Sequence, residues 1–128
     1  MRSFLSALPS LSLALLSTAV VAQQARLVVA EKGQQSLAII DPAAGKVLAS
    51  VPEGGITGHE VIASPDGRLA YVPIYGNSGV GKPGTDGSTM AVIDIAAEKV
   101  IDTVAFPHPV RPHCPFFGPQ DGLLYVST

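Results

Sequence analysis

The sequence predicts an all-β fold built from stacked copies of one four-stranded unit. The phrase at residues 64–72, SPDGRLAYV, returns at residues 118–126 as GPQDGLLYV. An apolar run ending in aspartate also occurs twice, at residues 37–41 and 90–94. No window after residue 22 shows the 3.6-residue periodicity of an amphipathic helix. Because self-similarity at this spacing marks a supersecondary unit that stacks on copies of itself, the repeat predicts the architecture.

The first 22 residues have the pattern of a secretory signal peptide. Arg2 supplies a positive charge, residues 4–21 are mostly apolar, and small residues around Ala22 suit cleavage. The alternative is an uncleaved anchor helix, which Pro9 and the interspersed serines weaken. No later stretch approaches the roughly 20 apolar residues that a membrane span needs. We therefore expect an exported protein, periplasmic or extracellular, whose mature part is residues 23–128.

Each unit contains four short runs that favour β-strands, rich in Leu, Val, Ile and Tyr. Alignment on the Asp-Gly turns gives one unit at residues 26–67 and the next at 68–122. Most of the extra length of the second unit is a glycine-rich insertion between its first two runs. The expected strands are residues 26–31, 36–40, 46–51 and 59–63, then 68–75, 89–93, 99–105 and 113–117.

The strands are separated by sequences with strong turn chemistry. The turn at residues 41–45 begins with Asp41, which can accept local N–H bonds, and ends with Gly45, which tolerates positive φ. Residues 94–98 occupy the same place with weaker turn chemistry. The Asp-Gly pairs at residues 66–67 and 121–122 are typical of tight hairpins.

Four short strands per unit of about 40–55 residues are typical of a β-propeller blade. The runs LAYV, AVIDI and KVIDTV of the second unit resemble the repeats of the YVTN-type (YncE-like) β-propeller family. The resemblance covers residues 26–128 and depends on strand and turn positions. It implies an exported propeller, commonly seven-bladed, with a binding or cell-surface role.

By analogy with WD-type propellers, the run that starts at each histidine is the innermost strand of its blade. On this interpretation, residues 26–51 are the outer strands of one blade, 59–105 are a complete blade, and 113–128 begin the next. A ring needs roughly six to eight such blades. We therefore expect an N-terminal fragment of a longer protein, with completion of the ring by an oligomer as the alternative.

Composition narrows the partners that can be expected. The formal net charge is −2, no basic run is present, and tryptophan is absent. These features argue against nucleic acid and anionic membrane as main partners. Cys114 is the single cysteine, which excludes an internal disulfide. No cofactor is predicted, and the expected partner is a protein or small-molecule ligand together with further blades.

His59 and His113 are the leading candidates for a binding site, since they hold equivalent positions in neighbouring units. Both should lie near the mouth of the central channel, with Tyr75 on its rim. A ligand would contact these three residues, and a divalent metal could use the two imidazoles. The structural alternative is that each histidine hydrogen-bonds a neighbouring blade and fixes the loop before its strand.

Other residues offer weaker chemistry. His108, His113 and Cys114 suggest a metal, but three prolines make this segment extended and no metal-ligand spacing is present. Glu60 could act as an acid–base group beside His59, and Arg111 could bind an anion. Residues 76–82 match G-x-x-x-x-G-K, yet Pro83 replaces the Mg²⁺-binding hydroxyl residue, so we expect a surface loop and no nucleotide site.

The predicted function is therefore that of an exported, non-catalytic β-propeller that acts as a binding scaffold. The alternative is a fragment of a propeller enzyme, either a lactonase-like hydrolase or a cofactor-assisted oxidoreductase. A site of that kind would lie at the channel mouth. Since function depends on the site and not on the fold, the repeat pattern alone does not separate these possibilities.

Overall fold

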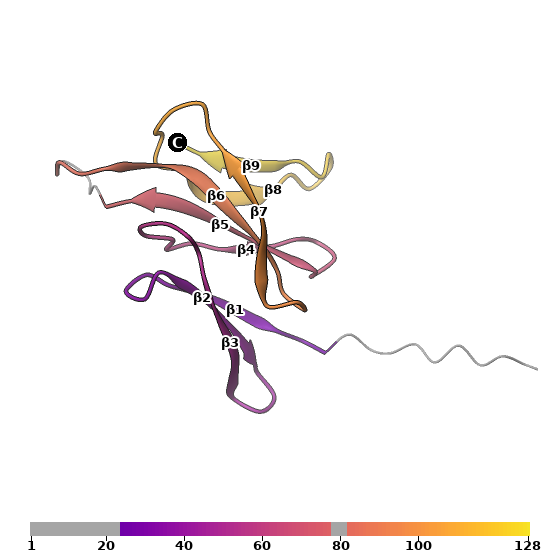
Figure 1. The fold of residues 1–128 in the computed structure, drawn as a ribbon. Helices are drawn as coiled ribbons and strands as arrows, with labels where there is room; N and C mark the ends of the chain where they lie inside the picture. The colour runs from indigo at the N-terminus through magenta and orange to yellow at the C-terminus, as the bar shows by residue number, and fades with distance from the viewer. Residues whose placement is uncertain (1–23, 78–81) are drawn as a thin grey trace, which may run out of the picture.

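The computed structural model describes residues 24–77 and 82–128, which form an all-β structure (Figure 1). This confirms the all-β part of the prediction, and the described residues contain no helix. It follows that no helix in this part of the chain is long and apolar enough to cross a membrane. The predicted signal peptide, and residues 78–81 of the insertion, lie outside the described residues.

The strands form three antiparallel sheets that lie one above another in Figure 1. The strand order is β1-β2-β3 in the first sheet, β4-β5-β6-β7 in the second and β8-β9 in the third. The strands are β1 (Leu27–Glu31), β2 (Ser36–Asp41), β3 (Lys46–Pro52), β4 (Ile62–Ala63), β5 (Leu69–Gly76), β6 (Asp86–Asp94), β7 (Lys99–Ala105), β8 (His113–Phe117) and β9 (Leu124–Ser127).

Two strands differ from their predicted extents by more than one residue at an end. β4 contains only Ile62–Ala63, because the chain before it makes a single bridge between Gly58 and Ile74 and turns at Thr57, where φ is 64°. β6 begins at Asp86 instead of residue 89. Its first residues extend the sheet because the segment after β7 bonds to them: the Val110 and Arg111 amides both donate to the Gly87 carbonyl.

The turns of the first and second sheets repeat the same hydrogen bonds. Asp41 Oδ1 accepts the amides of Ala43 and Ala44, at 2.9 and 3.1 Å. Asp94 Oδ1 likewise accepts the amides of Ala96 and Ala97, at 3.0 and 2.8 Å. A register shift also occurs at the same place in both sheets, before Ile40 and before Ile93. The β2–β3 and β6–β7 hairpins are therefore equivalent structures.

The strand pairs β4–β5 and β8–β9 are equivalent as well. Ile62 pairs with Tyr71, and Phe116 pairs with Tyr125. In both hairpins an aspartate, Asp66 or Asp121, accepts a backbone amide within the turn. Since His59 and His113 each precede these pairs by the same number of residues, the two histidines hold equivalent positions in adjacent sheets.

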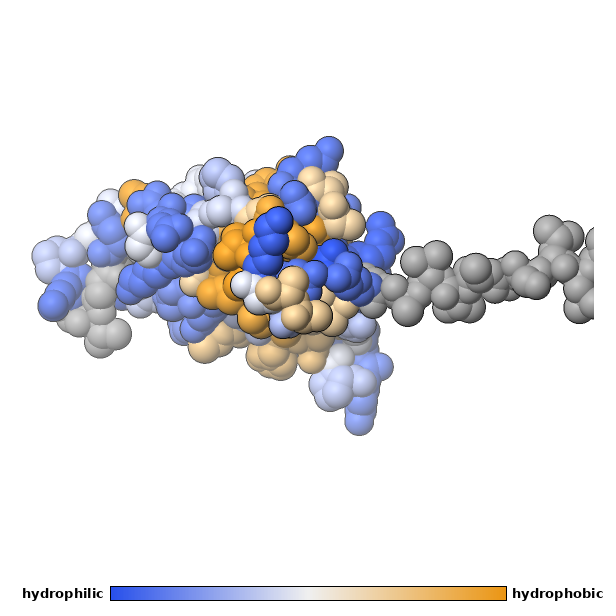
Figure 2. Space-filling view, turned by 90° about the horizontal axis from the view of Figure 1, so that it is seen from below, coloured by the Kyte–Doolittle hydropathy of each residue, from blue (hydrophilic) through white to orange (hydrophobic). Residues whose placement is uncertain are grey.

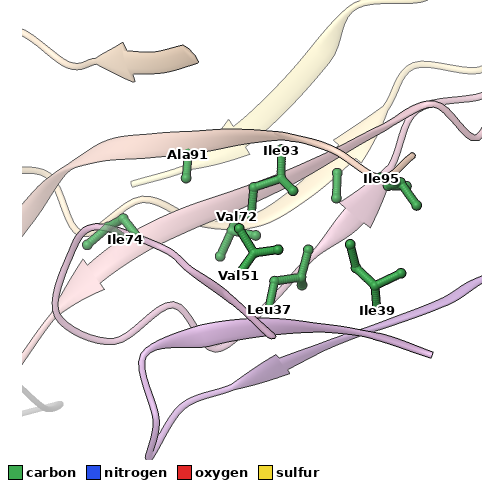
Figure 3. Packing of buried hydrophobic residues seen from close by; sticks show 9 residues of the cluster. Leu37, Ile39, Val51, Val72, Ile74, Ala91, Ile93 and Ile95 are labelled. Carbon is green, nitrogen blue, oxygen red and sulfur yellow. The ribbon is translucent and has the colours of Figure 1, made fainter. Parts of the chain in front are cut away.

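The hydrophobic core lies between the first and second sheets (Figure 3). Apolar side chains of β2 and β3 meet those of β5 and β6, and Leu37, Ile39, Val72 and Ile93 are completely buried. On its other face, the second sheet contacts the third, where the Tyr71 ring packs edge-on against Phe117 at 5.7 Å. The second sheet is thus covered on both faces.

The two outer sheets each expose apolar side chains. Leu27 and Val29 of β1 are 49% and 39% exposed. Figure 2 views the molecule from the side of β1–β3 and shows apolar residues gathered between hydrophilic ones. At the other end of the stack, Phe116 and Tyr125 lie with their rings stacked at 5.1 Å and remain about half exposed.

Candidate functional site

Three aromatic side chains from two adjacent sheets meet at one end of β5. The ring of Tyr75 packs edge-on against His59, with centroids 5.1 Å apart and planes at 71°. It packs in the same way against His113, at 5.8 Å and 75°. The structure therefore brings together the three residues that the sequence singled out, and Tyr75 is the shared contact. We call these three residues the His–Tyr–His cluster.

Backbone hydrogen bonds place His59 beside Tyr75. The amides of Tyr75 and Gly76 donate to the carbonyls of Thr57 and Ile56, both at 3.0 Å. The segment before His59 therefore runs along the end of β5 and holds the histidine next to the ring. The His59 side chain is 31% exposed, so ligands in solution can reach it.

His113 is oriented by the backbone just before it. Its Nδ1 donates to the carbonyl of Arg111 at 2.8 Å. In the neutral imidazole this contact places the proton on Nδ1 and leaves Nε2 as an acceptor, which has no hydrogen-bond partner among the described residues. Arg111 adopts φ of 52°, and its amide bonds to Gly87. Gly87 cannot be larger, since a Cβ there would lie 1.7 Å from the Ile74 carbonyl oxygen.

Arg111 adds a cation to the edge of the cluster. Its Nε donates to Asp86 Oδ1 at 2.6 Å, and the guanidinium also hydrogen-bonds to the Tyr75 side chain. The bond to Asp86 is the main reason that the pKa of Arg111 lies above its usual value, and the bond to Tyr75 contributes. The carboxylate offsets the arginine charge, so this edge is polar without being strongly cationic.

Glu60 links the second sheet to the third. Its Oε2 accepts the amide of Cys114, and its Oε1 lies 3.6 Å from the Cys114 sulfur. The charge of Glu60 is the main cause that raises the pKa of the Cys114 thiol. A raised pKa disfavours the thiolate, which is the nucleophilic form of cysteine. The pair therefore has the character of a structural contact between sheets.

The candidate metal ligands do not form a metal-binding set within the described residues. No three side chains of the His, Cys, Asp and Glu types lie together there in a way that could hold a metal ion. His108 is exposed and makes no hydrogen bond, ion pair or ring contact with His113 or Cys114 in this part of the chain. The carboxylate nearest to His59 is that of Glu60, whose Oε1 lies 3.8 Å from His59 Nε2.

The segment that resembles a phosphate-binding loop leads into a strand. Residues 78–81 lie outside the described residues, and Lys82 is exposed. After Lys82 the chain continues without a helix to Asp86, where β6 begins. A phosphate loop of this type requires a helix N-terminus directly after the lysine. The described residues therefore give no support to a nucleotide site.

One buried carboxyl group lies at the junction of the first and second sheets, and sequence reasoning did not find it. Glu53 is 3% exposed, and neither of its carboxylate oxygens has a hydrogen-bond partner within the described residues. A Cβ on Gly58 would lie 2.1 Å from Glu53 Oε2, so the glycine makes room for the carboxyl group. Its neighbours in the sequence, Pro52 and Gly54, are residues typical of turns and do not indicate burial.

Burial raises the pKa of Glu53 from 4.5 to about 7. The negative charge of Glu31 adds to the rise, while the Gly58 amide opposes it without meeting the geometry of a hydrogen bond. An uncompensated carboxylate in an apolar junction is costly, which favours the protonated form.

Comparison with known proteins supports the fold. No family model matches the sequence, and no curated protein matches it at a significant level. Among solved structures, hydrazine synthase of Kuenenia stuttgartiensis is similar, with a TM-score of 0.54 and 22% sequence identity. The similarity covers 69% of this chain and 23% of the hydrazine synthase chain, so the present chain spans a small share of that protein's length. At this identity the likeness concerns the fold alone.

Proposed function

We propose that the chain contributes consecutive β-propeller blades of the exported YVTN type to a binding scaffold, with a ligand site at the His–Tyr–His cluster. The observation that carries the proposal is the meeting of His59 and His113 on Tyr75. When repeats stack in the same orientation, equivalent residues of adjacent repeats lie next to one another on one side of the stack. Ligand sites commonly lie where neighbouring structural units meet.

The outer faces of the stack support the blade interpretation. Val29 of the first sheet is equivalent to Val72 of the second, because Val29 pairs with Ala38 and Val72 pairs with Ala91. Val72 is completely buried, whereas Val29 is 39% exposed. In the third sheet, Tyr125 is equivalent to Tyr71, which packs on Phe117. The exposed faces of the first and third sheets thus carry side chains like those on the buried faces. Such faces are expected where further blades cover them.

The free groups of the cluster indicate the class of ligand. His113 Nε2 is a hydrogen-bond acceptor, the three rings offer aromatic contacts, and Asp86 offsets the charge of Arg111. A small neutral molecule with an aromatic ring and one N–H or O–H donor suits this combination. The enzyme alternative would use Glu60, whose Oε1 lies 3.8 Å from His59 Nε2, but the same carboxylate accepts the Cys114 amide, which favours a structural role.

Indole is a suitable probe, since it combines an aromatic ring with a single N–H donor. We expect a titration with indole, followed by the imidazole Cε1–Hε1 NMR signals, to shift His59 and His113 saturably. The exposed His108 serves as an internal control that does not shift. Indene, which lacks the N–H, should bind more weakly. Tyr75→Ala should weaken binding about fivefold, because an aromatic contact contributes about 1 kcal/mol.

Tyr125→Ala is the matched control, since it removes a tyrosine at the far face of the third sheet and should leave the titration unchanged. Equal shifts at all three histidines, or shifts that survive Tyr75→Ala, would contradict the proposed site.

A further inference from the structure

The buried Glu53 belongs to the same linker that positions His59. The linker comprises residues 53–61, between β3 and β4. The Glu53 carboxyl group lies against Gly58, where an added Cβ would be 2.1 Å from Oε2 of Glu53 and 2.7 Å from the side chain of Val72. Gly58 directly precedes His59 in the sequence. A displacement of Gly58 by this carboxyl group would therefore also displace His59.

Few backbone hydrogen bonds join the linker to β5. The amides of Tyr75 and Gly76 donate to linker carbonyls, and Gly58 forms a single bridge with Ile74. Thr57 adopts φ of 64°, a conformation that a β-branched residue keeps only where its surroundings enforce it. A short segment with few hydrogen bonds and a strained residue is typical of the parts of a protein that open locally at a low free energy.

The groups that face Glu53 do not neutralise its charge. The neighbouring Val72 of β5 is apolar (Figure 3), and no lysine, arginine or histidine of the described residues forms an ion pair with Glu53. Glu31 of β1 acts on it with a negative charge, and Ser36 of β2 donates its hydroxyl to Glu31 at 2.9 Å. Glu60, the other carboxylate of the linker, bonds to β8. Ionisation of Glu53 thus leaves a buried charge that water must stabilise.

The junction between the second and third sheets has an apolar residue in the equivalent place. The Glu53 amide donates to the Gln35 carbonyl at 3.0 Å. At the same position after β7, the Phe106 amide donates to the Ser88 carbonyl at 2.8 Å. Phe106 is therefore the equivalent of Glu53, and an aromatic ring replaces the carboxyl group. The ionisable group is thus specific to the junction that carries the first histidine.

We propose that Glu53 is a pH-sensitive switch for the His–Tyr–His cluster: its neutral carboxyl group stays in the junction, whereas its ionised form moves toward water, opens the linker and releases His59 from Tyr75. The pKa of Glu53, about 7, places the change near neutral pH. Because Phe106 is not ionisable, the contact of His113 with Tyr75 should not depend on this switch. The consequence for a ligand rests on the proposed function, but the opening of the linker does not.

Hydrogen exchange of the Tyr75 and Gly76 amides reports the opening, since their acceptors lie in the linker. The pKa of Glu53 falls from about 7 toward 4.5 when the carboxyl group reaches water, so the equilibrium constant for opening should rise up to about 70-fold between about pH 5 and 8. We expect protection of the two amides, corrected for the intrinsic pH dependence of exchange, to fall at least about tenfold. Glu53→Gln, which cannot ionise, should show no such fall.

The Val110 and Arg111 amides are the matched control, since they bond to Gly87 in the segment before β8. Their protection should be alike in the wild type and in Glu53→Gln at each pH. Low concentrations of urea separate local opening from global unfolding, because only global unfolding exposes enough surface to respond. Exchange of the two linker-bonded amides should therefore be nearly independent of urea. Glu53→Leu is a second variant that cannot ionise, to be used if Glu53→Gln does not fold.

The ligand site should follow the switch. From about pH 5 to 8, the indole affinity of the wild type relative to Glu53→Gln should fall at least about threefold, because the fraction of molecules with His59 in place decreases. Both proteins contain the same titrating imidazoles, so the effect of these groups cancels in the ratio.

Equal amide protection in the wild type and Glu53→Gln at all pH values would overturn the switch, as would protection that follows urea. A fall in protection with a constant affinity ratio would overturn its control of the ligand site. Absence of indole binding at every pH would contradict the proposed function, and amide exchange, which needs no ligand, would still decide whether Glu53 opens the linker.

Discussion

Raising the pH from about 4 to about 8 is expected to lower the free energy of unfolding by about 3 kcal/mol through Glu53 alone. The pKa of Glu53 is raised to about 7 in the folded state from an ordinary value of 4.5. Between these values, the folded protein retains a proton that the unfolded chain releases. The stabilisation is therefore complete below about pH 4.5 and is lost as the pH rises through about 7.

Urea unfolding across this pH range, for the wild type and for Glu53→Gln, isolates the effect. The difference between the two stability curves should change by about 3 kcal/mol across the window. Glu98→Gln, at an exposed turn, is the matched control and should follow the wild type. Asp66 and Asp121 do not interfere, because their pKa values are lowered and their contributions are lost only as the pH falls below this window. A difference curve that stays flat would show that Glu53 is not buried.

Ile93→Ala is expected to destabilise the protein by about 2–5 kcal/mol, the usual cost of truncating a fully buried isoleucine. The Ile93 side chain is completely buried in the cluster between the first and second sheets, together with Leu37 and Ile39 (Figure 3). Truncation removes apolar contacts and leaves a cavity that neighbouring strands fill only in part. The free energy of unfolding in urea measures the loss.

Ile101→Ala makes the same chemical change on β7, where the side chain is 49% exposed. It should change the stability by no more than about 0.5 kcal/mol. If the two variants were equally stable, the sheets would not pack through Ile93, and the stacked arrangement would be wrong.

The local structure was largely predictable from the sequence, because it depends on chemistry within a few residues. The apolar runs around Ile39 and Ile93 identified central strands, and each is followed by an aspartate that accepts two turn amides. Alternating apolar composition and Asp-Gly turns are sufficient for such hairpins. The fold class followed from their repetition.

The remaining features depend on how the sheets meet, which a single sequence does not encode locally. Glu53 lies between Pro52 and Gly54 and gave no sign of burial, which arises from the approach of Gly58 in the linker to the next sheet. The contact of Arg111 with Asp86 likewise joins segments far apart in the chain. The equivalence of His59 and His113 could be predicted from the repeat, but their distances from Tyr75 required the structure.

A size difference between two equivalent residues shows the same division between local and long-range effects. The repeat aligns Ala63 with Phe117, yet the consequence of the smaller side chain, a groove between the first and second sheets, appears only where two sheets pack.

The central claim is that equivalent residues of adjacent sheets converge on one ring. Nuclear Overhauser effects in the NMR spectrum of the isotopically labelled protein test it directly. We predict cross-peaks from the Tyr75 ring protons to the imidazole protons of both His59 and His113, whose centroids lie 5.1 and 5.8 Å away. Cross-peaks to only one histidine, or to neither, would contradict the stacked arrangement and the binding site that depends on it.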